Sequence, residues 1–211
     1  MVGLTCTAGV TEIQPADIEK TTMRQIKVFN NISLDGYFVD QHGGMSWAHK
    51  SMSDPEFHAF VQNNAEGNDS ELLFGRITYE MMASFWPSQF AIENNPVVAK
   101  GMNSRTKHVA SRTLSTLDWE NSILLKGDLV PAVAKLKSEP GKDLVIFGSG
   151  TIISLLAGAG LIDEYQFVII PVVLGGGRTL FHGLEKPLEL KLTTSRAFSN
   201  GNVFVTYTVI D

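Results

Sequence analysis

Residues 143–181 read DLVIFGSGTIISLLAGAGLIDEYQFVIIPVVLGGGRTLF, and their pattern predicts a strand, a glycine turn, a helix, a second strand and a glycine loop. The apolar run Leu144–Phe147 is typical of a strand that is buried on both faces. Small residues, Gly148–Gly150, follow it at once. Thr151–Ala157 then carries apolar residues at helical spacing, and two glycines shortly after it indicate the end of the helix.

This junction of strand and helix is suited to binding a phosphate. The first N–H groups of a helix have no partner inside the helix, and the helix dipole is positive at that end. Glycines let an anion approach the backbone without a Cβ in the way. Gly-Ser-Gly is less than a full GxGxxG motif, however, so a glycine turn without any ligand is an equal alternative.

Two more junctions of the same kind lie earlier in the chain. The predicted strand Glu71–Phe74 runs into Gly75-Arg76-Ile77-Thr78, and the predicted strand Lys107–Ala110 runs into Ser111-Arg112. In open α/β sheets, ligands sit beyond the carboxyl ends of the strands. An arginine fork matches phosphate oxygens, although a single arginine is more often a solvated surface residue. Three such strand ends together favour a dinucleotide as the ligand.

The rest of the chain extends the alternation of strands and helices. Gln25–Ile32 alternates as a strand, a turn pair follows at Asp35-Gly36, and a second turn cluster occupies Val39–Gly44. Two strands, Leu188–Ser195 and Val203–Val209, close the chain with a turn between them. We therefore predict an α/β fold with a mostly parallel sheet and an antiparallel C-terminal hairpin.

The composition argues against two classes of partner. The chain has 211 residues, of which 44% are hydrophobic and 18% charged, which suits one domain with a core of its own. A net charge of −5 and the lack of a long basic run argue against nucleic acid and anionic membrane surfaces. No apolar run reaches the ~18–20 residues that a membrane-spanning helix needs.

Residues 1–22 show no sustained periodicity, and they lack the basic start and apolar middle of a secretion signal. We predict a flexible N-terminal extension there and one folded domain over residues 23–211; an arm that packs on a partner subunit is the alternative. The one cysteine, Cys6, rules out an intrachain disulfide and fits a reducing compartment, so we expect a cytoplasmic protein.

The motifs resemble those of the dihydrofolate reductase superfamily, and most closely its branch similar to the C-terminal reductase domain of riboflavin-biosynthesis deaminase/reductases. The similar segments span most of the chain after residue 25, and GLIDE with the later GGGRTLF is the most specific part. They are SLDGYF (33–38), MSW (45–47), LFGRITYE (73–80), VASRTL (109–114), VIFGSGTIISLLAGAGLIDE (145–164) and PVVLGGGRTLF (171–181).

The resemblance implies a three-layer fold around a twisted sheet of about eight strands, an NADPH cofactor and a homodimer. It also implies cofactor-binding residues in three groups, which are the diphosphate turn Gly75, Arg76 and Thr78, the 2′-phosphate site Ser111 and Arg112, and the second phosphate loop Gly148, Ser149, Gly150 and Thr151. The family usually has two adjacent glycines in that loop, and here a serine stands between two glycines. Gly175–Gly177 is expected to form a bend at the mouth of the active site or, equally, a loop between strands.

The resemblance implies hydride transfer from NADPH to a small heteroaromatic, pterin-like or ribosylamino-pyrimidine substrate. Folate reductases place a carboxylate on the first helix after a tryptophan, which makes Trp47 and Asp54 candidate catalytic residues. Asp54 also suits a helix cap, and the gap to Trp47 is longer than usual. Asp35 lies in the turn that would cover the nicotinamide, where a simple turn aspartate is the alternative.

Two further expectations complete the functional hypothesis. The histidines have no carboxylates at ligand spacing, so we predict no metal. The zinc signature of a deaminase is absent from these 211 residues, so we expect the reductase part alone. A protein of the same fold that binds a nucleotide or small molecule without turnover is the alternative function.

Overall fold

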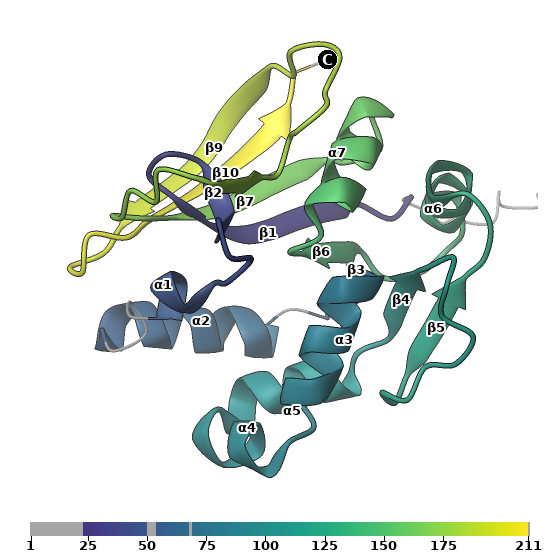
Figure 1. Ribbon diagram of the computed structural model, residues 1–211, viewed down its shortest axis with the longest axis horizontal. Helices are drawn as coiled ribbons and strands as arrows, with labels where there is room; N and C mark the ends of the chain where they lie inside the picture. The colour runs from purple at the N-terminus through teal and green to yellow at the C-terminus, as the bar shows by residue number, and fades with distance from the viewer. Residues whose placement is uncertain (1–22, 50–53, 68, 211) are drawn as a thin grey trace, which may run out of the picture.

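Figure 1 shows a computed structural model of the chain, which describes residues 23–49, 54–67 and 69–210. The predicted extension over residues 1–22, with Cys6, lies outside the described residues. No helix within these ranges is long and apolar enough to cross a membrane.

The structure centres on an eight-stranded sheet with the strand order β5-β4-β3-β6-β1-β7-β10-β9. Pairings from β5 through to β7 are parallel, whereas β10 pairs antiparallel with both β7 and β9. The predicted α/β class, the mostly parallel sheet and the antiparallel C-terminal hairpin are therefore confirmed. The eight strands are β1 (Ile26–Ser33), β3 (Glu71–Gly75), β4 (Lys107–Ala110), β5 (Ser122–Leu125), β6 (Leu144–Phe147), β7 (Glu164–Ile170), β9 (Leu190–Ala197) and β10 (Val203–Val209).

Helices cover both faces of this sheet (Figure 1). On one face, α7 buries Ile152 and Ile153 in a core that also contains Ile26 and Val28 of β1. On the other face, the first turn of α2 buries Phe57 against Val168 of β7. The helices are α1 (Ser46–His49), α2 (Pro55–Gly67), α3 (Arg76–Phe85), α4 (Gln89–Asn94), α5 (Pro96–Ser104), α6 (Leu129–Ser138) and α7 (Gly150–Gly158).

A second, two-stranded sheet was not predicted. The strand β2 (Tyr37–Asp40) pairs antiparallel with β8 (Gly177–Thr179), so the turn cluster expected from Val39 in fact starts within a strand. A Cβ on Gly177 would collide with the carbonyl oxygen of Val39, and the φ of Gly177 is +146°. The close approach of the two backbones requires a glycine at the start of β8.

The segment from Ala91 to Ser104 contributes to α4 and forms the whole of α5. Pro96 occupies the first turn of α5, where the missing backbone N–H of a proline costs no helical hydrogen bond. Asp128 is the N-cap residue of α6, but its side chain makes no capping hydrogen bond.

Candidate functional site

The carboxyl ends of β4, β3 and β6 lie next to one another, and each carries one of the predicted phosphate-binding turns. Gly75 at the end of β3 pairs with Ala110 at the end of β4, directly before Ser111. The backbone N–H of Gly75 donates to the Ser149 hydroxyl at 3.0 Å, from the turn after β6. The three turns therefore meet at one edge of the sheet, because parallel strands in register end together.

Ser149 joins two of these turns. Its hydroxyl accepts from Gly75 and donates to the Thr78 hydroxyl at 2.9 Å. Its backbone has a φ of 59° and a ψ of 50°, in the left-handed region that non-glycine residues seldom adopt. A residue held there costs of order 1–3 kcal/mol, which the surrounding contacts must offset. The serine that departs from the family pattern thus acts as a connection between β3–α3 and β6–α7.

Asn30 is a site residue that sequence reasoning missed. It is only 3% exposed, on the face of β1 that also buries Ile26 and Val28. Its side-chain oxygen accepts from the N–H of Gly148 at 2.8 Å, and its Nδ2 has no hydrogen-bond partner among the described residues. This amide could have been recognised from the sequence, because it takes a buried position in an alternating apolar strand. A buried amide costs free energy unless it forms hydrogen bonds.

The predicted basic residues lie at the surface of this edge. Arg76 is exposed and donates two hydrogen bonds to Glu80, at 2.8 and 3.2 Å, within the first turns of α3. The Ser111 hydroxyl accepts from the N–H groups of Thr113 and Leu114, at 3.1 and 3.0 Å, and so shapes its own turn. Arg112 beside it is exposed. Neither arginine is buried, so both can reorient toward a ligand.

The backbone of the turn after β6 is suited to the diphosphate of a dinucleotide. Gly148 has a φ of +57°, and a Cβ there would lie 3.1 Å from the Thr78 hydroxyl oxygen. The consecutive left-handed residues Gly148 and Ser149 turn the chain so that α7 begins at Gly150. Gly150 and Thr151 then supply the free N–H groups that begin a helix, whereas the N–H groups of Gly75 and Gly148 are already engaged.

Asp35 holds the glycine loop before β8. Its carboxylate accepts from the Ser33 hydroxyl at 2.6 Å, and from the N–H groups of Gly175 and Leu174 at 2.8 and 3.1 Å. These hydrogen bonds, that of Ser33 first, keep the pKa of Asp35 below its ordinary value. Asp35 is therefore an ionised carboxylate that positions the loop before β8, in addition to its place in the turn after β1. A contact of Asp35 with nicotinamide stays a prediction.

Asp54 caps α2, which confirms one of its two predicted roles. One carboxylate oxygen accepts from the N–H of Phe57 at 2.8 Å, and the other accepts from the Ser199 hydroxyl at 2.8 Å. Both bonds, that of Phe57 first, lower the pKa of Asp54, whereas a proton donor near neutral pH needs a raised pKa. Trp47 in α1 is half-buried beside the same helix. A catalytic role for Asp54 and Trp47 stays a prediction.

A large pocket lies between the sheet and the helices α2, α3 and α5, with a volume of about 560 Å³. This is within the range of ligand pockets, which hold roughly 300–1,000 Å³. Phe29, Phe147 and Trp86 provide aromatic walls, and Phe147 immediately precedes the Gly-Ser-Gly turn. Phe147 brings one end of the pocket to the edge where the turns meet, whereas Asp69, Ser70 and Arg105 line it at the amino ends of β3 and β4.

Arg105 gives this pocket a positive charge. Its guanidinium donates to the carbonyl of Ala65 at 2.7 Å, while none of the ion pairs formed by the described side chains includes it. Burial lowers the pKa of Arg105, and nearby Asp69 opposes that shift. An arginine remains charged under such shifts, so the site suits an acidic group. No spacing pattern identified Arg105, since it depends on how α5 packs on α2.

A metal centre has no candidate in the described part of the chain, where no three His, Cys, Asp or Glu side chains come together.

The family model of the RibD C-terminal domain matches residues 24–204. The chain belongs to the RibD C-terminal domain family. The uncharacterized protein YyaP of Bacillus subtilis (strain 168) is 30% identical over 178 residues, which cover 83% of this chain and 90% of YyaP. The resemblance stated from the motifs is thereby confirmed, and the fold is of the RibD reductase type.

Two solved structures are similar to this chain. A Shewanella sp. PV-4 protein named for riboflavin biosynthesis is 27% identical, with a TM-score of 0.68 over 89% of this chain and 99% of its own. Dihydrofolate reductase from Enterococcus faecalis, solved with NADP(H) and RAB-propyl, has a TM-score of 0.57 over 89% of this chain and 97% of its own. It is 14% identical, so this second likeness shows the dihydrofolate reductase-like fold alone.

Substitutions at Ser149 test its role as a connection. Ser149→Ala removes both hydrogen bonds and keeps the left-handed strain, so we expect the free energy of unfolding to fall by about 1–3 kcal/mol. Ser149→Gly also removes the bonds but relieves the strain, so its loss should stay below about 1 kcal/mol. Urea unfolding measures both. Equal losses in the two variants would contradict the role described for this serine.

The pH dependence of stability tests the Asp35 contacts. The folded pKa of Asp35 is lowered, so its contribution is complete above the unfolded pKa and is lost as pH falls through the folded pKa. Asp35→Asn should therefore destabilise the protein at pH 7 and flatten the acid limb of a plot of Tm against pH. Asp118→Asn, an exposed aspartate in another loop, is the control and should leave that limb unchanged.

Proposed function

We propose that the protein is an NADPH-dependent reductase of a small heteroaromatic, pterin-like or ribosylamino-pyrimidine substrate. The observation that carries this proposal is the meeting of three turns at one sheet edge, with Ser149 joining the turns after β3 and β6. A pocket with aromatic walls reaches that edge at Phe147. Membership of the RibD C-terminal domain family supports the same chemistry.

The cofactor, when bound, supplies a hydride from nicotinamide C4 to the carbon of a C=N or C=O group, and a proton completes the reduction at the nitrogen or oxygen. The protein's part is to hold the two reactants in line and to exclude water. The N–H groups of Gly150 and Thr151, with the positive end of α7, would receive the diphosphate.

The exposed arginines would bind the remaining phosphate charge. Arg76 can exchange Glu80 for a phosphate, because an exposed ion pair between neighbouring helical turns contributes little to stability. Arg112, next to the tight turn at Ser111, would take the adenosine 2′-phosphate. This contact would select NADPH over NADH, since NADH lacks that group.

The substrate would occupy the large pocket. A flat ring would pack against Phe29 and Phe147, whose ring centroids are 5.7 Å apart, and against Trp86, which follows α3. Arg105 would bind an acidic tail. Both a folate, with its carboxylates, and a phosphorylated ribosylamino-pyrimidine have a ring and such a tail.

A binding protein without turnover is the second candidate, favoured by the state of the two carboxylates. Asp54 uses both oxygens, on Phe57 and Ser199, and Asp35 is engaged with Ser33 and the glycine loop. Neither is a free acid. Reduction of an open-chain ribose imine or aldehyde needs no such acid, so this observation weighs more against a folate-type reaction than against a riboflavin-type one. From the family resemblance we also propose a homodimer, and from the single cysteine and the lack of a secretion-signal pattern a cytoplasmic location.

Cofactor binding is tested by thermal unfolding with NADPH and NADH. A ligand that binds only the native state raises Tm, so we expect a shift with NADPH that exceeds the shift with NADH. Arg112→Ala should weaken NADPH binding by about 10- to 100-fold and leave NADH binding unchanged. Lys135→Ala, an exposed charge on α6, is the matched control.

The absence of a shift with either nucleotide at saturating concentration would overturn the reductase proposal. A shift with NADPH, followed by no loss of NADPH absorbance with either dihydrofolate or the riboflavin-pathway pyrimidine, would support the binding protein.

The proposed contact between Arg105 and the acidic tail of the substrate is tested with dihydrofolate or the riboflavin-pathway pyrimidine, whichever is turned over. Arg105→Gln retains a donor for the Ala65 carbonyl but loses the charge, so KM should rise about 10- to 100-fold with little change in kcat. The same substrate without its carboxylates or phosphate is the control, and its KM should be equal for the two proteins. An unchanged KM for the acidic substrate would place its tail elsewhere.

A further inference from the structure

Arg178 in β8 carries a positive charge that no acidic side chain among the described residues neutralises. The residue is exposed, and none of the ion pairs between described side chains includes it. Other exposed arginines differ in this respect, since Arg76 is paired with Glu80 and Arg196 with Glu56. An arginine without an acidic partner is ready to bind an anion through its fork of N–H groups.

The pairing of β8 with β2 fixes the base of this side chain. Arg178 pairs with Val39, and Gly177 before it lies too close to the Val39 carbonyl for any Cβ. The guanidinium lies over the ring of Phe38, with its central carbon 5.8 Å from the ring centroid. This cation–π contact needs no hydrogen-bond acceptor, so it leaves the N–H donors of Arg178 to a ligand.

The same phenylalanine ring lies against the first residue of α7. A Cβ on Gly150 would be 2.8 Å from Cε1 of Phe38 and 3.4 Å from the carbonyl oxygen of Thr179. Thr179 directly follows Arg178, and consecutive Cα atoms are about 3.8 Å apart, so the long side chain of Arg178 begins beside the first turn of α7. That turn, at Gly150 and Thr151, carries the N–H groups proposed to receive the diphosphate.

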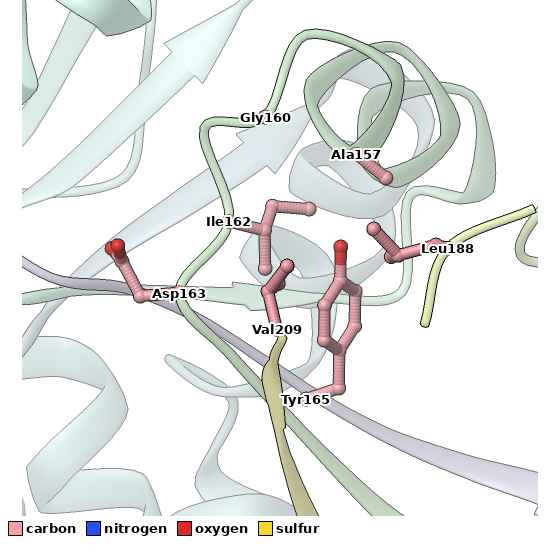
Figure 2. A pocket seen from close by; sticks show the side chains of 7 residues that line it. All are labelled: Ala157, Gly160, Ile162, Asp163, Tyr165, Leu188 and Val209. Carbon is pink, nitrogen blue, oxygen red and sulfur yellow. The ribbon is translucent and has the colours of Figure 1, made fainter. Parts of the chain in front are cut away.

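The opposite end of α7 does not offer an alternative anion site. A hollow there is lined by Ala157, Gly160, Ile162, Asp163, Tyr165, Leu188 and Val209 (Figure 2). Its charged member, Asp163, is acidic, and the nearby ammonium of Lys137 is already bound to it at 2.7 Å. The C-terminal end of a helix is also the negative end of its dipole. An anion is therefore favoured at the first turn of α7, on the side of Arg178.

We propose that Arg178 binds the diphosphate of the cofactor, together with the N–H groups of Gly150 and Thr151. The inference rests on the proposed binding of NADPH at the three turns. Each phosphate of the diphosphate carries a negative charge, and Arg76 can answer it only by giving up Glu80. Arg178 breaks no ion pair when it binds. The small sheet of β2 and β8, which the motifs did not reveal, thereby becomes part of the nucleotide site.

Fluorescence titrations of the whole protein with NADPH and with NADH test this role. Both nucleotides contain the diphosphate, so Arg178→Gln should weaken the binding of both by the same factor, about 10- to 100-fold. Arg178→Lys keeps the charge but not the fork, so its loss should be smaller, about threefold to tenfold. Arg196→Gln removes another exposed arginine, which lies 4.7 Å from the ring centroid of Phe198, and should change neither affinity.

The urea midpoint without nucleotide should be the same in wild type and Arg178→Gln, because the removed charge is exposed. The inference is overturned if wild type binds NADPH and Arg178→Gln binds it equally well, and the proposed function would then still stand. A loss confined to NADPH would also overturn it, since that pattern belongs to the 2′-phosphate. If wild type binds neither nucleotide, the inference and the proposed function fail together.

Discussion

The hydrogen bonds of the Ser149 hydroxyl are the interactions on which the proposed site depends. Parallel register already brings the ends of β3, β4 and β6 to one edge, but register alone does not fix the turns that follow. The bonds from Ser149 to Gly75 and Thr78 do so, at the cost of a left-handed serine. The backbone N–H groups that remain for an anion are those of the first turn of α7.

Two further side chains extend this framework across the edge. Asn30 on β1 receives the N–H of Gly148, and Asp35 after β1 receives the N–H groups of the loop before β8. Polar side chains, instead of apolar packing, thus set the positions of the loops around the proposed nucleotide. The consequence is that the carboxylates expected to perform chemistry, Asp35 and Asp54, are first of all structural acceptors.

The sequence predicted the features that depend on local pattern. Alternating strand and helix signals fixed the sheet class, and glycines after apolar strands located the turns at Gly75 and Gly148. Features that depend on distant partners were missed. The strand β2 pairs with the distant strand β8, where Asp40 and its partner Gly177 are 137 positions apart in the chain. A four-residue segment has no hydrophobic period of its own that would reveal such a pairing. Arg105 gained its place in the pocket from tertiary packing alone.

The central claim is that the turns after β3, β4 and β6 bind one nucleotide together. A two-dimensional NMR titration with NADPH tests this claim residue by residue. The account predicts that the largest amide shifts at saturation occur at Arg76, Arg112, Gly150 and Thr151 together, with one dissociation constant. Shifts confined to a single turn, or largest at residues distant from this edge such as Gly160, would contradict it.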